Sequence, residues 1–145
     1  VISSGGNAAL GQQSLLTDDV SLGSEILFAL GAAAREFEAE YRELLRTATK
    51  SGLPVIVCTI YNGNFPSIET SIVTSTALTP FNDAIIRAAW EHELPIIDLR
   101  TICNRPEHYA NPIEPSTEGS ARIAEAILRT IKRMNRSDPT KGKKE

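Results

Sequence analysis

The side chains best suited to chemistry lie in three polar segments, each of which follows a short apolar run. The first segment, SSGGNA, contains Gly5, Gly6 and Asn7. The second, YNGNFP, covers residues 61–66, and the third extends over residues 98–114. An asparagine amide at the end of a strand can donate a hydrogen bond to a developing oxyanion, or it can close an Asx turn. Both roles remain open for Asn7 on the residues alone.

The second segment offers Tyr61, Asn62 and Asn64 as candidate binding residues, because they end an apolar run where a ligand would lie. The alternative is a plain turn, since Asn-Gly is a strong turn former. The third segment contains His108, which is either a reactive base or an exposed loop histidine. On the residues alone, each segment is therefore either part of a functional site or a plain turn or loop.

Other kinds of chemistry are not favoured. The stretch GGNAALG matches neither dinucleotide nor P-loop glycine patterns, so a phosphate site is not expected. Cys58 and Cys103 lie in or just after apolar runs, which indicates buried free thiols. Together with His92 and His108 they show no zinc-ligand spacing. We therefore predict no cofactor and no metal.

Composition describes a soluble globular protein of one domain. The chain has 145 residues, of which 41% are hydrophobic and 23% charged, and its net charge is -3. This balance argues against nucleic acid as a partner. No apolar run approaches about 18 residues, so no membrane span is predicted, and no secretory leader is visible. We expect a cytoplasmic protein, with a removed upstream leader left open because residue 1 is Val and resembles the inside of a strand.

Strands and helices are expected to alternate. An apolar residue recurs every three or four positions between Ile26 and Lys50, which is typical of one helix face. After Pro66 the pattern fits either one kinked helix or a loop and a shorter helix that begins at Thr79-Pro80. The predicted strands cover 1–4, 53–61 and 94–99, the last helix covers 116–136, and a disordered basic tail covers 137–145.

This alternation predicts an α/β fold, a three-layer sandwich with a parallel sheet of the flavodoxin-like kind. Ligands of such sheets lie at the carboxyl ends of the strands. The three polar segments should therefore converge on one site.

Two motifs resemble those of the SGNH, or GDSL-type, hydrolase superfamily. They are Gly5-Gly6-Asn7 after a strand, and Pro115-Ser116 with Gly119 at the start of the last helix. The resemblance implies that residues 1–136 are an incomplete SGNH-like domain that lacks its amino-terminal part. The nucleophilic serine would lie upstream of residue 1, and Asn7 would donate to the oxyanion hole.

The sequence departs from the family pattern where the resemblance is most specific. Ala8 stands where the family has Asp, Asn111 stands at the family Asp position, and Glu114 at the family His position. An unperturbed glutamate, with a pKa of about 4.3, is a poor base near neutral pH. His108 is then the candidate substitute base, whereas Glu114 is equally well explained as a carboxylate at a helix entry.

Two functions follow from the resemblance. One is a serine hydrolase that acts on a small ester or acyl substrate. The other is a catalytically degenerate domain that binds a ligand or a protein. If strands of the sheet belong upstream of residue 1, this chain lacks them. The sheet edge beside residues 1–4 is then exposed and could pair with another chain in an oligomer.

Overall fold

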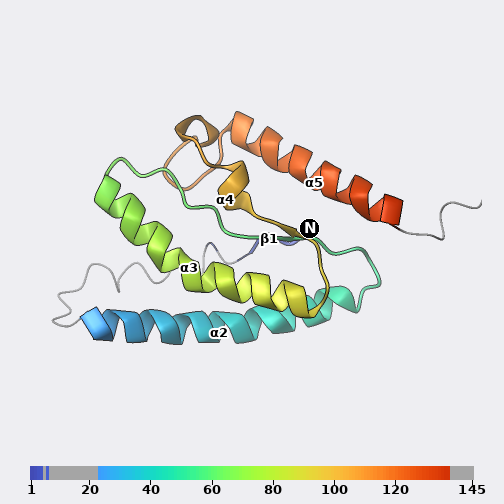
Figure 1. Ribbon diagram of the computed structural model, residues 1–145, viewed down its shortest axis with the longest axis horizontal. Coiled ribbons are helices and arrows are strands. Elements are labelled where there is room, and N and C mark those ends of the chain that lie inside the picture. Colours follow the sequence, from blue (N-terminus) through green and yellow to red (C-terminus); the bar gives the residue numbers. More distant parts are fainter. Residues whose placement is uncertain (5, 7–22, 138–145) are drawn as a thin grey trace, which may run out of the picture.

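The protein is elongated and mostly helical. The computed structural model describes residues 1–4, 6 and 23–137 (Figure 1). The main helices are α2 (Gly23–Thr49), α3 (Ile68–Glu91) and α5 (Thr117–Ser137), with the short helices α4 (Leu99–Ile102) and η2 (Pro106–His108) between α3 and α5. The strands are β1 (Val57–Cys58) and β2 (Ile96–Ile97). Of the predicted tail 137–145, only Ser137, the end of α5, is among the described residues.

The prediction of a three-layer α/β sandwich with a parallel sheet is wrong. Within the described residues β1 and β2 form a two-stranded parallel sheet, in which Val57 pairs with Ile96 and Cys58 with Ile97. Ile2 adds an isolated parallel bridge to Val57. Helices make up most of the described chain. Of the three expected strands, those at 53–61 and 94–99 are two residues long, and the one at 1–4 is reduced to the bridge at Ile2.

Side chains explain why the strands are so short. Beyond β1, the backbone N–H of Ile60 donates to Oδ1 of Asn82 at 2.7 Å, and the Asn82 amide donates to the Ile60 carbonyl at 3.0 Å. Beyond β2, the N–H of Leu99 donates to the Thr59 hydroxyl and begins α4. Backbone groups that would extend a ladder are therefore satisfied by side chains instead.

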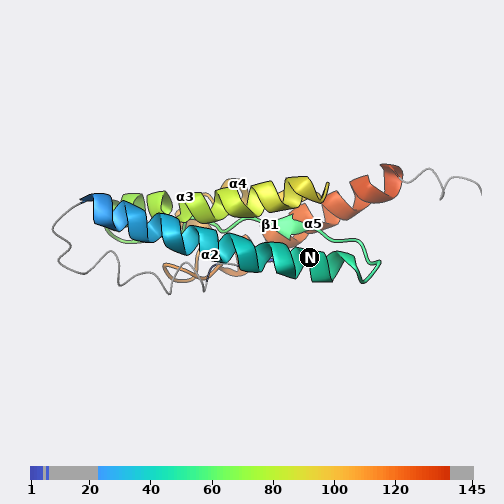
Figure 2. The same ribbon diagram turned by 90° about the horizontal axis from the view of Figure 1, so that it is seen from below.

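The two faces of β1 contact different helices. Val55 and Val57 join an apolar cluster with α2 and α3, whereas Ile56 and Cys58 join a second cluster with α5. This alternation is the period of an extended segment that is buried on both faces. Figure 1 shows α2 and α3 on one side of the strands and α5 on the other, and Figure 2 shows α2 and α3 running side by side.

Helix α3 settles one alternative that the sequence left open. It runs without a break from Ile68 to Glu91 with Pro80 inside it, so the single-helix interpretation is confirmed. Ser67 caps its first turn by accepting a hydrogen bond from the N–H of Thr70 at 3.3 Å.

Helices α2 and α3 are joined by aromatic and ionic contacts. The Phe37 ring lies 5.4 Å from the ring of Phe81. On the same side, the Glu38 carboxylate accepts hydrogen bonds from Arg42 and Arg87, which holds the pKa of Glu38 below its usual value. None of the helices in the described part of the chain has the length and apolar character needed to cross a membrane.

Candidate functional site: a polar pocket beyond the strands

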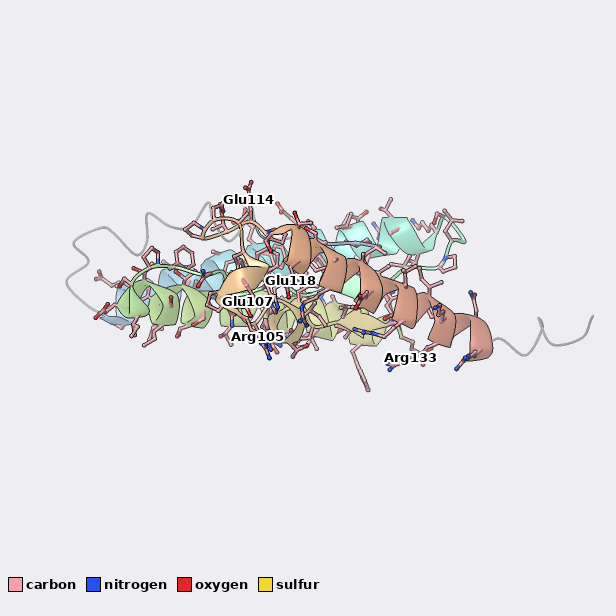
Figure 3. All side chains as sticks on the ribbon, turned by 90° about the horizontal axis from the view of Figure 1, so that it is seen from above. Arg105, Glu107, Glu114, Glu118 and Arg133 are labelled. Carbon is pink, nitrogen blue, oxygen red and sulfur yellow. The ribbon has the colours of Figure 1, made fainter. Side chains whose placement is uncertain are left out.

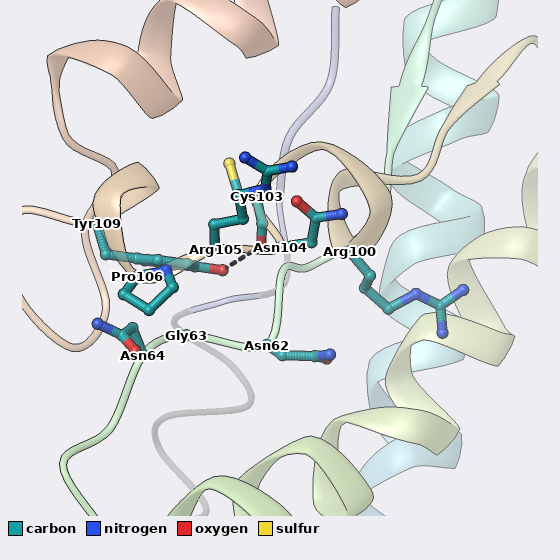
Figure 4. Close-up of a pocket in the computed structure, with 9 residues that line it drawn as sticks. All are labelled: Asn62, Gly63, Asn64, Arg100, Cys103, Asn104, Arg105, Pro106 and Tyr109. Atoms are coloured by element: carbon teal, nitrogen blue, oxygen red, sulfur yellow. Dashed lines mark hydrogen bonds between the residues drawn. The ribbon is translucent and has the colours of Figure 1, made fainter.

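A polar pocket of about 210 Å³ lies where the chain leaves β1 and β2. Its walls come from two loops that face each other, one just after β1 and the other just after α4 (Figure 4). The lining residues are Asn62, Gly63, Asn64, Arg100, Cys103, Asn104, Arg105, Pro106 and Tyr109. Residues of the second and third polar segments thus line one pocket, while Gly5, Asn7 and Ala8 of the first segment lie outside the described residues.

Two hydrogen bonds to backbone carbonyls join the loop after β1 to the chain that follows α4. The N–H of Asn64 donates to the Pro112 carbonyl at 2.8 Å, and the Tyr61 hydroxyl donates to the Ile113 carbonyl at 2.9 Å. Gly63 adopts a φ of 81°, and a Cβ atom there would approach the Pro112 carbonyl oxygen to 2.7 Å. Glycine is therefore required at position 63, both for its backbone conformation and for the close approach of the loops.

Asp98 organises the entry to α4. Its carboxylate caps the helix by accepting from the N–H of Arg100, and it also accepts from the Thr59 hydroxyl at 2.8 Å. The Arg100 guanidinium donates two further hydrogen bonds to it, at 2.8 and 2.7 Å. These bonds, chiefly those from Arg100, lower the pKa of Asp98, and in return they raise the pKa of Arg100. The charge of Arg100 is therefore largely neutralised inside the protein.

The inner wall of the pocket combines aromatic rings with a thiol. The Tyr61 and Tyr109 rings meet edge to face at 5.7 Å, and the Tyr109 hydroxyl donates to the Cys103 carbonyl at 2.7 Å. Burial raises the pKa of Tyr109 to about 12 and also raises that of the Cys103 thiol. Both groups therefore stay protonated near neutral pH, and Cys103 is not activated as a nucleophile.

Four polar side chains of the pocket have no hydrogen-bonding partner among the described residues. They are the amides of Asn62, Asn64 and Asn104 and the guanidinium of Arg105, and all four residues are exposed. The Arg105 guanidinium lies 3.8 Å from the Glu107 carboxylate, which is beyond hydrogen-bonding distance. These groups are available to a ligand without breaking an existing hydrogen bond.

Only part of the predicted first segment can be placed. Gly5 and Asn7, with Ala8, lie outside the described residues, so the proposed oxyanion donor stays a prediction. Gly6 is half-buried and is not among the residues that line the pocket. Of the second segment, Asn62 and Asn64 line the pocket, and Tyr61 supports it from behind through Tyr109 and Ile113.

Asn111 and Glu114 lie together but outside the pocket. The Asn111 amide donates to the Glu114 carboxylate, and its Oδ1 accepts from the N–H groups of Ile113 and Glu114 at 3.0 and 2.9 Å. Both residues are exposed, and Figure 3 shows Glu114 at the outer edge of its loop, away from Arg105 and Glu107. This arrangement is an Asx-type turn closed by its own carboxylate.

His108 occupies neither of the two positions expected for it. Its side chain is completely buried and not exposed, and it does not line the pocket. Nδ1 accepts from the N–H of Asn104 at 3.2 Å, while Nε2 has no hydrogen-bond partner among the described residues and lies 3.7 Å from the Glu118 carboxylate on α5. The structure therefore gives His108 a packing role between its loop and α5.

Most of the α4 side of the pocket was not predicted from sequence patterns. They indicated a buried thiol at Cys103 and no binding role for Arg100, Asn104, Arg105 or Tyr109. A signal was present, because these polar residues follow directly on the apolar run that contains β2. The carboxyl-end rule that selected Asn62 applied equally to Asn104.

The chain was compared with known proteins in three ways. No protein-family model, no curated protein and no solved structure matches it. Function must therefore be inferred from the chemistry of the pocket itself.

Proposed function

We propose that this protein binds a small polar ligand in the pocket between the loop after β1 and the loop after α4. The observation on which the proposal rests is the set of polar side chains there that make no hydrogen bond within the described residues, namely the three asparagine amides and the guanidinium of Arg105, which is only loosely paired with Glu107. Exposed amides in a concave site lose little on meeting a ligand when, as here, no internal hydrogen bond has to be broken.

The size of the pocket limits the ligand. Sites for drug-sized molecules have volumes of roughly 300 to 1,000 Å³. At about 210 Å³ this pocket suits a smaller molecule. Its protonated Cys103 and Tyr109 favour binding over reaction, because neither is a ready nucleophile or base near neutral pH.

Hydrolysis of a small ester or acyl compound stays a prediction from the family resemblance. It depends on Asn7 and on a nucleophile that the described residues do not supply to this pocket. Binding without turnover is the better supported of the two functions, because Asn111 and Glu114 are committed to their own turn outside the pocket. A protein partner at this site is less well supported, since the pocket is small and polar.

Nuclear magnetic resonance of the ¹⁵N-labelled chain tests the proposal. The chain is titrated with glycerol, glycolamide and sodium glycolate, three small polar probes. We expect at least one probe to shift the backbone amides of Asn62, Gly63, Cys103 and Asn104 with a saturating, millimolar dissociation constant. The amides of α2 should stay in place.

A pocket-filling variant provides the control. Asn104→Trp should abolish the saturating shifts, whereas Asn135→Trp, at an exposed position of α5, should leave them unchanged. Circular dichroism checks that both variants are folded. If no probe shifts the pocket amides, or if Asn104→Trp binds as well as the native chain, ligand binding in this pocket is refuted.

A further inference from the structure

The charges that line the pocket are of one sign. Arg100 and Arg105 are the charged members of the lining, and no aspartate or glutamate is among its nine described residues. Each arginine has a carboxylate partner outside the lining, Asp98 for Arg100 and Glu107 for Arg105, so an anion can bind only where that partner is easily displaced. The two arginines are nevertheless not equivalent, and the difference between them identifies the group that is free to bind.

Arg100 is already engaged. Its guanidinium donates to both oxygens of Asp98, which is the paired geometry that guanidinium and carboxylate prefer. An external anion would have to displace Asp98, a residue that also caps α4 and accepts from Thr59. Arg100 therefore shapes the wall of the pocket and does not compete for ligand.

Arg105 is the available cation. Its side chain is 65% exposed, and its guanidinium lies 3.8 Å from the Glu107 carboxylate. Glu107 is itself exposed, so this loose pair is worth little and can be exchanged for a ligand carboxylate at small cost. The planar guanidinium fork matches the two oxygens of a carboxylate.

The asparagines add a second requirement. Each amide offers both N–H donors and a carbonyl acceptor. Asn104, which precedes Arg105 in the chain, can therefore bind a hydroxyl group placed next to the anion, whereas the Asn62 and Asn64 side chains point in opposite directions (Figure 4). One available cation suits the single charge of a carboxylate better than the near-double charge of a phosphate monoester.

Building on the ligand binding proposed above, we infer that the pocket selects a small hydroxycarboxylate, whose carboxylate accepts hydrogen bonds from Arg105 and whose hydroxyl bonds the Asn104 amide. Arg105 thereby acts as the specificity-determining residue of the site. Glu107 acts as an internal competitor for the same guanidinium.

The test compares glycolate with glycolamide, which differ only in the replacement of a carboxylate oxygen by an amide nitrogen. Both are titrated into the ¹⁵N-labelled chain at constant ionic strength, with inorganic phosphate as a third probe. We expect glycolate to bind at least about fivefold more tightly than glycolamide or phosphate, the size expected for one charge-assisted contact that is partly screened by solvent.

Three variants test whether Arg105 is responsible for the preference for glycolate. Arg105→Gln should weaken glycolate binding about fivefold and leave glycolamide binding unchanged. Glu107→Gln should strengthen glycolate binding, because it removes the competing carboxylate. Arg129→Gln is the matched control, since Arg129 on α5 is similarly exposed and lies 3.9 Å from Glu125, and it should change neither affinity.

The possible results separate this inference from the proposed function. If glycolate and glycolamide bind the pocket equally, or if Arg105→Gln has no effect on glycolate, the carboxylate inference is overturned while ligand binding stands. Phosphate that binds as tightly as glycolate overturns it as well. If no probe shifts the pocket amides, the proposed function fails and the inference fails with it.

Discussion

The two sides of β1 have different structural roles. On the side of α2 and α3, ten buried residues form one apolar cluster, and ionic contacts join the two helices across its surface. On the side of α5, the buried cluster has five members. The loops that form the pocket belong to this second side, where Tyr61 and Ile102 pack against the smaller cluster. The larger apolar core thus lies on one face of the strand and the proposed ligand pocket beside the other, an arrangement typical of loops carried on a rigid scaffold.

The largest effect should come from the α2–α3 side. Ile85→Ala removes a side chain that is completely buried there, and we expect a loss of roughly 3 to 4 kcal/mol in the free energy of unfolding. Ile127→Ala, the same change in a partly buried residue on the α5 side, should cost about 1 kcal/mol. Urea denaturation measures both, and equal losses would contradict the division of roles.

A polar residue on the α2–α3 side should rank next. Asn82→Ala leaves the N–H and carbonyl of Ile60 without their partners, and we expect it to destabilise the fold by roughly 2 to 3 kcal/mol. Asn62→Ala, in the exposed pocket wall, should cost less than about 0.5 kcal/mol. The same urea experiment tests the pair. If Asn82→Ala lowers the free energy of unfolding by less than about 1 kcal/mol, the end of β1 is held by other contacts.

On the pocket side, the free energy of unfolding should decrease at acid pH. The pKa of Asp98 in the folded chain lies below its ordinary value of 3.8, chiefly because of Arg100. Its contribution is therefore fully present above pH 3.8 and is lost as the pH falls through the lower, folded pKa. Asp98→Asn should flatten this part of the stability profile, measured by urea midpoints between neutral and acid pH, and Arg100→Gln should do the same. If both variants lose stability at acid pH as the native chain does, Asp98 is not the cause of that loss.

The smallest expected signal is enzymatic. We predict no measurable hydrolysis of 4-nitrophenyl acetate by this chain, because Asn111 and Glu114 bond each other outside the pocket and Cys103 is held as a thiol. The assay compares the chain with buffer and with Asn7→Ala. Turnover that disappears in Asn7→Ala would revive the hydrolase function.

Local sequence patterns predicted the helices better than the sheet. The apolar repeat between Ile26 and Lys50 marks a helix that the structure places at Gly23–Thr49. The run from Leu53 to Tyr61 also predicted an extended segment, but only Val57 and Cys58 belong to a strand. The reason is non-local, since Asn82 lies 22 residues away and satisfies the backbone of Ile60. No pattern within the run indicates that partner.

The site was predictable in outline. The rule that ligands lie beyond strand ends selected Asn62 and Asn64, which line the pocket, and ligand binding by them stays a prediction. It could not rank Arg105 above Arg100, because their availability depends on where Asp98 and Glu107 lie. Nor could it separate His108 from the pocket, since only the packing against α5 shows that its ring is enclosed. The oligomer expected through the edge beside Ile2 stays a prediction.

One further consequence concerns Gly119, whose Cα faces the carbonyl of His108. A Cβ at this position would collide with that carbonyl oxygen, which already accepts from the N–H of Ser116. A single added methyl group would therefore push the first turn of α5 away from the loop that also carries Arg105 and Tyr109. In a deep mutational scan, position 119 would look like a functional residue although it has no functional group. Substitutions at position 119 would be harmful because the space between α5 and the His108 carbonyl is too small for a Cβ atom.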